Sequence, residues 1–146
     1  MKPRKKENSK QPTHEDIQAL LNFLPVFKTL GFDPVVRWHG GDKDKNGVIH
    51  MPFPEYDPNV GKFFHLASSE CWCDYEYTSS GAGKMVRNKE LIQNASLAEL
   101  KSLLTYCVRG ERFGDGVWED FFNEGIIQSI LERLKIICEN KNLSTK

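Results

Sequence analysis

The chain has 146 residues, and its 20 Lys and Arg residues balance 20 Asp and Glu residues, so the formal net charge is zero. A chain of this length fits one domain that buries roughly two-thirds of its unfolded surface, and a core of that size needs neither disulfides nor a structural metal. No apolar run approaches the length of a membrane span and the N-terminus lacks the apolar core of a signal peptide, which predicts a cytoplasmic protein without a membrane partner.

Charge is unevenly distributed along the chain. Residues 1–10 hold five basic side chains and one acidic side chain, so this tail carries +4 and residues 11–146 carry −4. A net acidic body argues against broad binding to nucleic acid. Because the tail is polar and lacks apolar periodicity, residues 1–11 are predicted to be disordered, as are residues 141–146, on either side of a single helical domain over residues 12–140.

The first predicted element is a helix that starts after Thr13. Thr13 followed by Asp16 is the pattern of a capping box, in which side chains and backbone at the helix start hydrogen-bond reciprocally. Apolar residues then recur at helical spacing up to Phe27. Pro25 lacks the N–H that the preceding turn needs, so the helix is expected to kink or restart there.

A small antiparallel hairpin is predicted over residues 34–53. The β-branched and aromatic run that ends in Trp38 and His39 is typical of a strand. Residues 48–53 provide the return strand, which the neighbouring prolines should end.

The loop between those strands resembles part of a calcium site. Residues 42–47 match the first six positions of a helix–loop–helix calcium loop, but the twelfth position is Phe53, where a bidentate glutamate should close the coordination shell. Asp and Asn beside Gly47 are also what a tight turn needs. The sequence therefore favours a turn and predicts no metal site.

Residues 57–94 predict further helical segments joined by irregular stretches. Asp57 followed by proline is a cap with proline at the first helical position, and this helix should end near Glu70. Residues 74–77 look like an exposed strand or extended segment. Residues 79–85 predict a flexible loop, because they lack the first glycine and the Ser or Thr of a phosphate loop.

Four cysteines are present, and the sequence predicts neither a metal site nor an obligatory disulfide among them. Cys71 and Cys73 are separated by one residue, whereas zinc knuckles and redox pairs use two. Cys107 and Cys138 lie on apolar helical stripes, where a reduced thiol packs as a small hydrophobic group.

Three helices are predicted in the last third of the chain. Ser96 and Glu99 form a second capping box before an apolar stripe. The second helix covers about residues 117–124, with Asp115 as its N-cap, and the third covers about residues 126–140. Together the elements predict a mainly α (α+β) fold, a compact bundle of about six helical segments with a small antiparallel β-hairpin.

The segment between the first two of these helices concentrates charged side chains among three glycines. It contains Arg109, Glu111, Arg112 and Asp115. The two arginines stand three residues apart, so they share a helical face if the helix continues and could clamp an anion. The sequence favours a structural role over this clamp: Arg112 is expected to pair with Asp115 or Glu111 and lock the turn, while Arg109 reaches toward a ligand.

The same segment resembles a known family. The pattern Arg-x-Glu-Arg-Phe-x-Asp-Gly-x-Trp over residues 109–118, followed by the helix around residues 130–134, resembles an uncharacterised family of bacterial and phage domains known as domain of unknown function 6508. The resemblance extends over most of residues 15–138. It implies a prokaryotic or viral source and a single helical domain, and it implies no reaction, because the family carries no assigned activity or catalytic residues.

Two classes of function remain open, and the sequence favours a binding protein over an enzyme. No serine or cysteine is tied by spacing to a histidine, so nucleophilic catalysis lacks support, and no cofactor is predicted. The favoured class is an accessory protein that sequesters a ligand or inhibits a host or defence protein. The expected partner is a protein or a small phosphorylated ligand, and a homodimer stays open.

The alternative class is a small enzyme or nucleotide-binding domain. In that case the paired arginines hold phosphate, an aromatic side chain stacks on a base and a carboxylate handles a proton. Support for this class increases if the arginine head groups converge with the aromatic side chains on one open pocket. It decreases if the arginine head groups are buried against carboxylates. The candidate ligand-binding residues are Arg109, Glu111, Arg112, Asp115, Trp38, His39 and Tyr75.

Overall fold

The computed structural model describes residues 11–78 and 81–144 and is built mostly from helices. The elements are, in chain order, α1 (His14–Leu21), α2 (Leu24–Phe27), β1 (Val35–His39), β2 (Phe53–Tyr56), α3 (Pro58–Ala67), the 3₁₀ turn η1 (Glu70–Trp72), α4 (Ala82–Met85), α5 (Lys89–Gln93), α6 (Leu97–Gly110), the 3₁₀ turn η2 (Glu111–Phe113), α7 (Val117–Asn123) and α8 (Ile126–Ser144). The predicted mainly α (α+β) class, a helical bundle with a small antiparallel hairpin, is confirmed.

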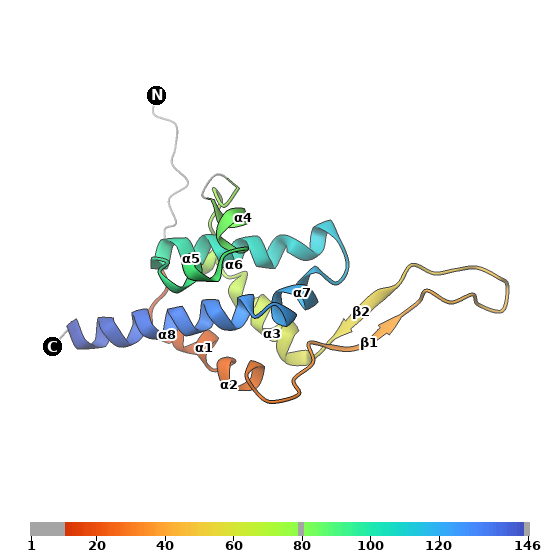
Figure 1. Cartoon of the computed structure of the whole chain (residues 1–146), viewed down its shortest axis with the longest axis horizontal. Helices are drawn as coiled ribbons and strands as arrows, with labels where there is room; N and C mark the ends of the chain where they lie inside the picture. The colour runs from red at the N-terminus through yellow and green to blue at the C-terminus, as the bar shows by residue number, and fades with distance from the viewer. Residues whose placement is uncertain (1–10, 79–80, 145–146) are drawn as a thin grey trace, which may run out of the picture.

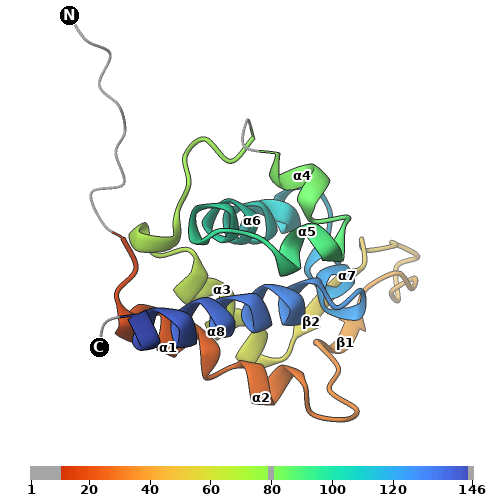
Figure 2. The ribbon, with the colours of Figure 1, turned by 60° about the vertical axis from the view of Figure 1, so that its left-hand side comes forward.

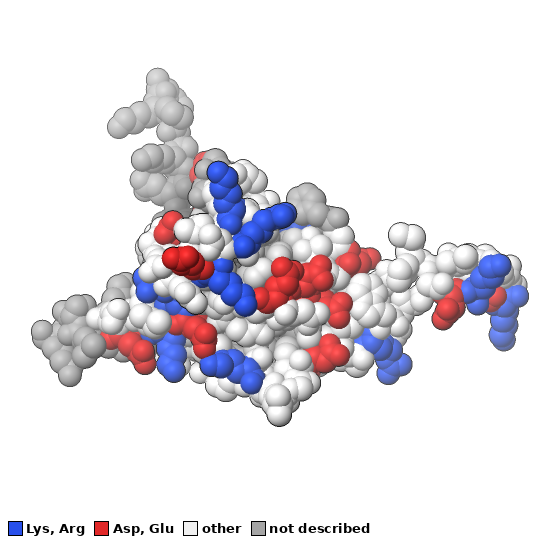
Figure 3. Space-filling model, viewed as in Figure 1, with Lys and Arg blue, Asp and Glu red and all other residues white. Residues whose placement is uncertain are grey.

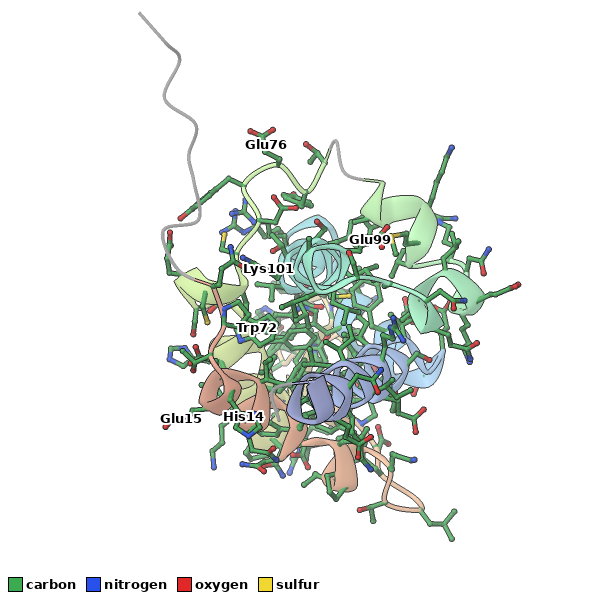
Figure 4. All side chains as sticks on the ribbon, turned by 90° about the vertical axis from the view of Figure 1, so that its left-hand side faces the viewer. His14, Glu15, Trp72, Glu76, Glu99 and Lys101 are labelled. Atoms are coloured by element: carbon green, nitrogen blue, oxygen red, sulfur yellow. The ribbon has the colours of Figure 1, made fainter. Side chains whose placement is uncertain are left out.

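Two long helices, α6 and α8, organise the body (Figures 1 and 2). They run alongside each other, and α1, α2, α5 and α7 also pack on α8. Their facing sides are apolar because Leu and Ile recur at helical spacing, and Leu100, Leu104, Ile127 and Ile130 are fully buried. Figure 4, which looks along these helices, shows Trp72 of η1 between α6 and the α1–α8 pair, where its side chain is buried.

Both predicted capping boxes are present. Thr13 Oγ1 accepts the Asp16 N–H at 3.1 Å, and Asp16 Oδ2 accepts the Thr13 N–H at 2.8 Å. Ser96 and Glu99 make the same reciprocal pair at the start of α6, at 3.1 and 2.9 Å. Pro25 lies in the first turn of α2 and separates it from α1. Local signals therefore set where these helices begin.

The hairpin projects from the helical body as an arm (Figure 1), which we define as residues 35–56. β1 and β2 pair antiparallel, and every residue from 40 to 51 is exposed. The predicted return strand over 48–53 is wrong, because β2 begins at Phe53 and includes Pro54. A proline is tolerated there because one edge of an outer strand needs no backbone donor.

The turn at the tip of the arm is organised by Asp44. Its Oδ1 accepts the N–H groups of Asn46 and Val48 at 2.8 and 3.0 Å, and its Oδ2 lies 3.1 Å from His50 Nε2. These hydrogen bonds hold the pKa of Asp44 below its usual value, and the one from the Val48 N–H contributes most. Gly47 adopts φ +78°, as the predicted turn requires.

Two irregular segments differ from expectation. Residues 74–77 form a turn rather than an extended segment, because the Asp74 carbonyl accepts the Tyr77 N–H at 3.2 Å. The predicted flexible loop contains the short helix α4, whose Ala82 and Met85 are buried, and this burial stabilises a helical turn in a glycine-containing stretch. Residues 1–10, which form most of the predicted basic tail, lie outside the described residues.

All four cysteines are free thiols, and Cys107 and Cys138 are buried as predicted. Burial raises the pKa of the Cys107 thiol. Among the helices of the described ranges, none is long and apolar enough to cross a membrane.

Candidate functional site

The turn between α6 and α7 is held by the carboxylate of Glu111. Its Oε1 accepts the Trp118 N–H and its Oε2 accepts the Gly116 N–H, each at 2.9 Å. The Tyr56 hydroxyl donates to the same carboxylate at 2.8 Å. Glu111 therefore satisfies backbone donors that the first turn of α7 leaves unpaired. The prediction of Asp115 as N-cap is wrong, because the cap is Gly116 at φ +95°, which leaves Asp115 exposed one residue outside.

Tyr56 ties this turn to the arm and to the core. Burial raises the pKa of the Tyr56 hydroxyl well above its usual value, and the hydrogen bond to Glu111 acts in the same direction. The Trp118 ring lies beside Tyr56 at 5.3 Å, stacks on Phe64 at 4.1 Å, and donates its Nε1–H to the Cys107 carbonyl at 2.9 Å. Glu111 thus belongs to a structural cluster that joins the arm, α3, α6 and α7.

Arg109 and Arg112 line one small cavity, which we call the anion pocket. Arg109 is half-buried and Arg112 is exposed, and neither forms an ion pair with a carboxylate of the described residues. The prediction that Arg112 pairs with Asp115 or Glu111 is wrong, because the Glu111 carboxylate faces Tyr56 and the backbone of α7, and Arg112 forms no ion pair with Asp115. The cavity has a volume of about 180 Å³ and is lined by Ala67, Ser68, Cys73, Thr105, Val108, Arg109 and Arg112.

Arg109 is positioned by Tyr77. The guanidinium carbon of Arg109 lies 5.2 Å from the centroid of the Tyr77 ring, which is a cation–π distance. The turn that carries Tyr77 is anchored on α6, because the Asp74 N–H donates to Thr105 Oγ1 at 2.9 Å. Sequence reasoning missed Tyr77, since a turn in space and not a spacing along the chain brings it to Arg109.

Tyr77 also lines a larger cavity, which we call the aromatic pocket. Its volume is about 360 Å³, and it is lined by Tyr77, Arg87, Tyr106, Gly110, Val117, Asp120, Phe121 and Glu124. A Cβ atom at Gly110 would lie 2.9 Å from side-chain atoms of both Val117 and Phe121, so only a glycine lets α7 approach α6 this closely. Acidic side chains gather over α7 on the face that Figure 3 shows. Tyr106 had a sequence signal, since it lies three residues before Arg109 on the same helix.

The remaining predicted site residues do not line the anion pocket. Trp38 is 44% exposed and lies against Gly116, where an added Cβ would come within 2.9 Å of the indole ring. His39 Nε2 lies 2.8 Å from a carboxylate oxygen of β2 within the arm. The Tyr75 hydroxyl donates to Glu70 at 2.7 Å, which raises the pKa of Tyr75 to about 12. The two arginines therefore line the same cavity, and Tyr77, rather than the expected aromatic residues, contacts Arg109.

Another cavity, of about 570 Å³, lies between α1, α2 and α8. In its wall, Cys138 Sγ lies 3.5 Å from His14 Nδ1. Lys28 at its edge forms an ion pair with Glu132 at 2.7 Å. Its polar groups come from the exposed surfaces of several helices.

Fold and site together define a small helical domain with a projecting arm and an arginine-lined pocket. Residues 12–140 match the model of the Family of unknown function (DUF6508), so the chain belongs to that family. This confirms the resemblance inferred from the sequence.

Among curated proteins, the chain is similar to the tRNA (guanine-N(7)-)-methyltransferases of Yersinia enterocolitica serotype O:8 / biotype 1B and of Yersinia pestis (strain Pestoides F). In each case the identity is 26% over 121 residues, which covers 75% of this chain and 48% of the relative. The chain thus spans about half the length of the curated relatives it matches. No solved structure matches the chain.

Proposed function

We propose that this protein is a binding protein that takes a small phosphorylated ligand in the anion pocket, and that it acts in the bacterial cytoplasm, or in the host cytoplasm if a phage encodes it. The observation that carries the proposal is that Arg109 and Arg112 line one cavity while no described carboxylate neutralises either of them. Two arginine side chains that line one cavity can bind the oxygens of a phosphate group, because a guanidinium offers several N–H donors in a fixed planar arrangement.

A purely structural role explains only part of this arrangement. Arg109 lies in the last turn of α6, where a positive charge complements the helix dipole. Its stacking on Tyr77 adds a second structural contact. Neither reason applies to the exposed Arg112, which lies beyond the end of α6. A ligand that needs both guanidinium groups accounts for both positions.

The similarity to tRNA (guanine-N(7)-)-methyltransferases makes components of nucleic acid reasonable ligands to test. We propose no methyl transfer for this chain. The alternative of a small enzyme is weakened by the position of Glu111, whose carboxylate is occupied by Tyr56, Gly116 and Trp118. A group held in that way is poorly placed to move a proton on a ligand.

Calorimetric titration with ribose 5-phosphate at low salt tests the proposal. We expect saturable binding with one site per chain, and we expect Arg109→Gln and Arg112→Gln each to weaken it at least fivefold. Arg109→Lys and Arg112→Lys should restore it only in part, because lysine keeps the charge but loses the planar donor pair. Lys62→Gln is the matched control, since Lys62 is exposed on α3 and does not line the pocket. Equal binding by wild type and the double glutamine variant would remove the anion pocket as the site.

A second candidate function, inhibition of a host or defence protein, is favoured by the arm. Val48, Ile49 and Met51 are 51%, 61% and 82% exposed, which is an unusual concentration of apolar side chains on a projecting segment. Affinity isolation from bacterial extract should then recover a protein with the wild type that is lost with the Ile49→Thr, Met51→Thr variant. Recovery of the same proteins by both chains would contradict this second function.

A further inference from the structure

The residues that line the aromatic pocket suit a planar ring. Its inner surface is formed by Gly110, Val117 and Phe121, of which Gly110 and Phe121 are buried. The half-buried rings of Tyr77 and Tyr106 flank it, and the Tyr106 and Phe121 rings lie 6.2 Å apart. A volume of about 360 Å³ is within the range of small-ligand sites. Aromatic side chains beside an apolar surface favour stacking of a flat, polar ring such as a nucleobase.

The mouth of this pocket offers hydrogen-bond acceptors. Asp120 on α7 and Glu124 at the C-cap of that helix are both exposed and both line the cavity. Among the described residues neither carboxylate forms an ion pair. A carboxylate accepts two parallel hydrogen bonds, so it selects a ring edge that carries two adjacent N–H donors. Guanine has such an edge, formed by its N1–H and its 2-amino group.

One contact joins the aromatic pocket to the anion pocket. Tyr77 lines the aromatic pocket, Arg109 lines the anion pocket, and the guanidinium of Arg109 lies 5.2 Å from the Tyr77 ring. On α6, Tyr106 faces one cavity and Arg109, three residues later, faces the other. Two cavities along one helix, joined by the contact between Arg109 and Tyr77, supply the ring site and the phosphate site that a nucleotide needs.

We infer that the ligand is a guanine nucleotide, with its base in the aromatic pocket and its phosphate in the anion pocket. This inference rests on the proposed anion-binding function. An organic cation is the competing occupant of a pocket with acidic and aromatic side chains. Arg87 also lines the mouth, and its positive charge disfavours a cation while it can donate to the carbonyl oxygen of guanine.

The first experiment compares four probes by calorimetric titration of the wild type. Guanosine 5′-monophosphate should bind at least tenfold more tightly than ribose 5-phosphate, which lacks the base. Inosine 5′-monophosphate, which lacks only the 2-amino group, should bind between the two. Equal affinity for guanosine 5′-monophosphate and ribose 5-phosphate would overturn the inference and leave the proposed function standing. Absence of binding by every phosphorylated probe would overturn both the inference and the proposed function.

Spermidine is the fourth probe and tests the competing occupant. Tighter binding of spermidine than of guanosine 5′-monophosphate would overturn the inference in favour of a cation.

The second experiment locates the base with variants. Asp120→Asn and Glu124→Gln should remove the preference for guanosine over inosine 5′-monophosphate while ribose 5-phosphate affinity stays within twofold of wild type, which also shows that the variants are folded. Glu15→Gln is the matched control, because Glu15 is exposed on α1 and also loses one negative charge (Figure 4). Tyr106→Ala should reduce affinity for both nucleotides and not for ribose 5-phosphate. An unchanged guanosine preference in both carboxylate variants would overturn the placement of the base.

Discussion

At the scale of single residues, Glu111 is the side chain on which the turn between α6 and α7 depends. Its carboxylate accepts the N–H groups of Gly116 and Trp118 and the hydroxyl of Tyr56, at 2.8 to 2.9 Å. Glu111→Ala leaves these partly buried donors unpaired, and hydrogen bonds to a charged group contribute about 1.5–3 kcal/mol each. Because water reaches part of the cluster, we expect a loss of about 2–4 kcal/mol in the free energy of unfolding, measured in urea melts.

The control for this prediction is Arg112→Ala. Arg112 is exposed and makes no ion pair with the described carboxylates, so its removal should change stability by no more than about 0.5 kcal/mol. This reverses the expectation from sequence, in which Arg112 locked the turn. A larger loss with Arg112→Ala than with Glu111→Ala would restore the original expectation.

Tyr56 provides a pH-dependent prediction. Its pKa is raised in the folded protein by burial and by Glu111, whereas a tyrosine in the unfolded chain has a pKa of about 10. Above that pH the unfolded chain releases a proton that the native state keeps, so the stabilisation is fully present below about pH 10 and is lost as the pH rises. Urea melts from pH 9 to 11.5 should show a steeper fall for wild type than for Tyr56→Phe. Parallel curves would show that Tyr56 ionises normally in the fold.

At the scale of elements, the close approach of α6 and α7 depends on Gly110. Alanine in a helix is more stable than glycine by about 1 kcal/mol, but a Cβ at Gly110 would lie 2.9 Å from Val117 and Phe121. Gly110→Ala is therefore expected to destabilise the protein by about 1–3 kcal/mol through overpacking. Gly61→Ala in α3 is the matched control, since a Cβ there meets nothing within 4 Å, and it should stabilise by up to about 1 kcal/mol. Thermal melts compare the two, and stabilisation by both variants would show that α7 can shift away.

Elements whose signals are local could be predicted from the sequence. The capping boxes at Thr13 and Ser96 and the apolar stripe of α8 involve residues within a few positions, and each lies where it was expected. The return strand and the cap of α7 could not be predicted. In both cases a contact distant along the chain is involved. Trp38 pairs with Pro54 in the hairpin, and Tyr56 donates to the Glu111 carboxylate that accepts the Gly116 N–H.

The candidate site could also be predicted only in part from the sequence. The sequence identified Arg109 and Arg112 because charged residues among glycines are conspicuous. It could not identify Tyr77 as the partner of Arg109, since the turn over residues 74–77 is set by hydrogen bonds to α6. Trp38 and His39 are conspicuous in the sequence but belong to the arm.

At the scale of the whole molecule, the helical body and the tip of the arm are expected to be independent. Residues 42–49 are all exposed, and the Gly41 N–H donates to the His50 carbonyl at 2.7 Å, so a two-residue Asn-Gly turn can replace them. The free energy of unfolding of this shortened chain should lie within about 1 kcal/mol of that of the wild type, and its affinity for ribose 5-phosphate should be unchanged. Urea melts and titration measure both quantities. A loss of several kcal/mol would mean that the tip stabilises the body.

NMR of arginine side chains can show whether Arg109 and Arg112 bind the same anion. In ¹⁵N-labelled protein, the Nε–Hε signals can be assigned through Arg109→Lys and Arg112→Lys and followed during titration with ribose 5-phosphate. If Arg109 and Arg112 form one site, these two signals should shift together along one saturable binding curve, while the signal of the exposed Arg37 on the arm should not move. Shifts confined to Arg37, or spread evenly over all arginines without saturation, would contradict one shared anion-binding site.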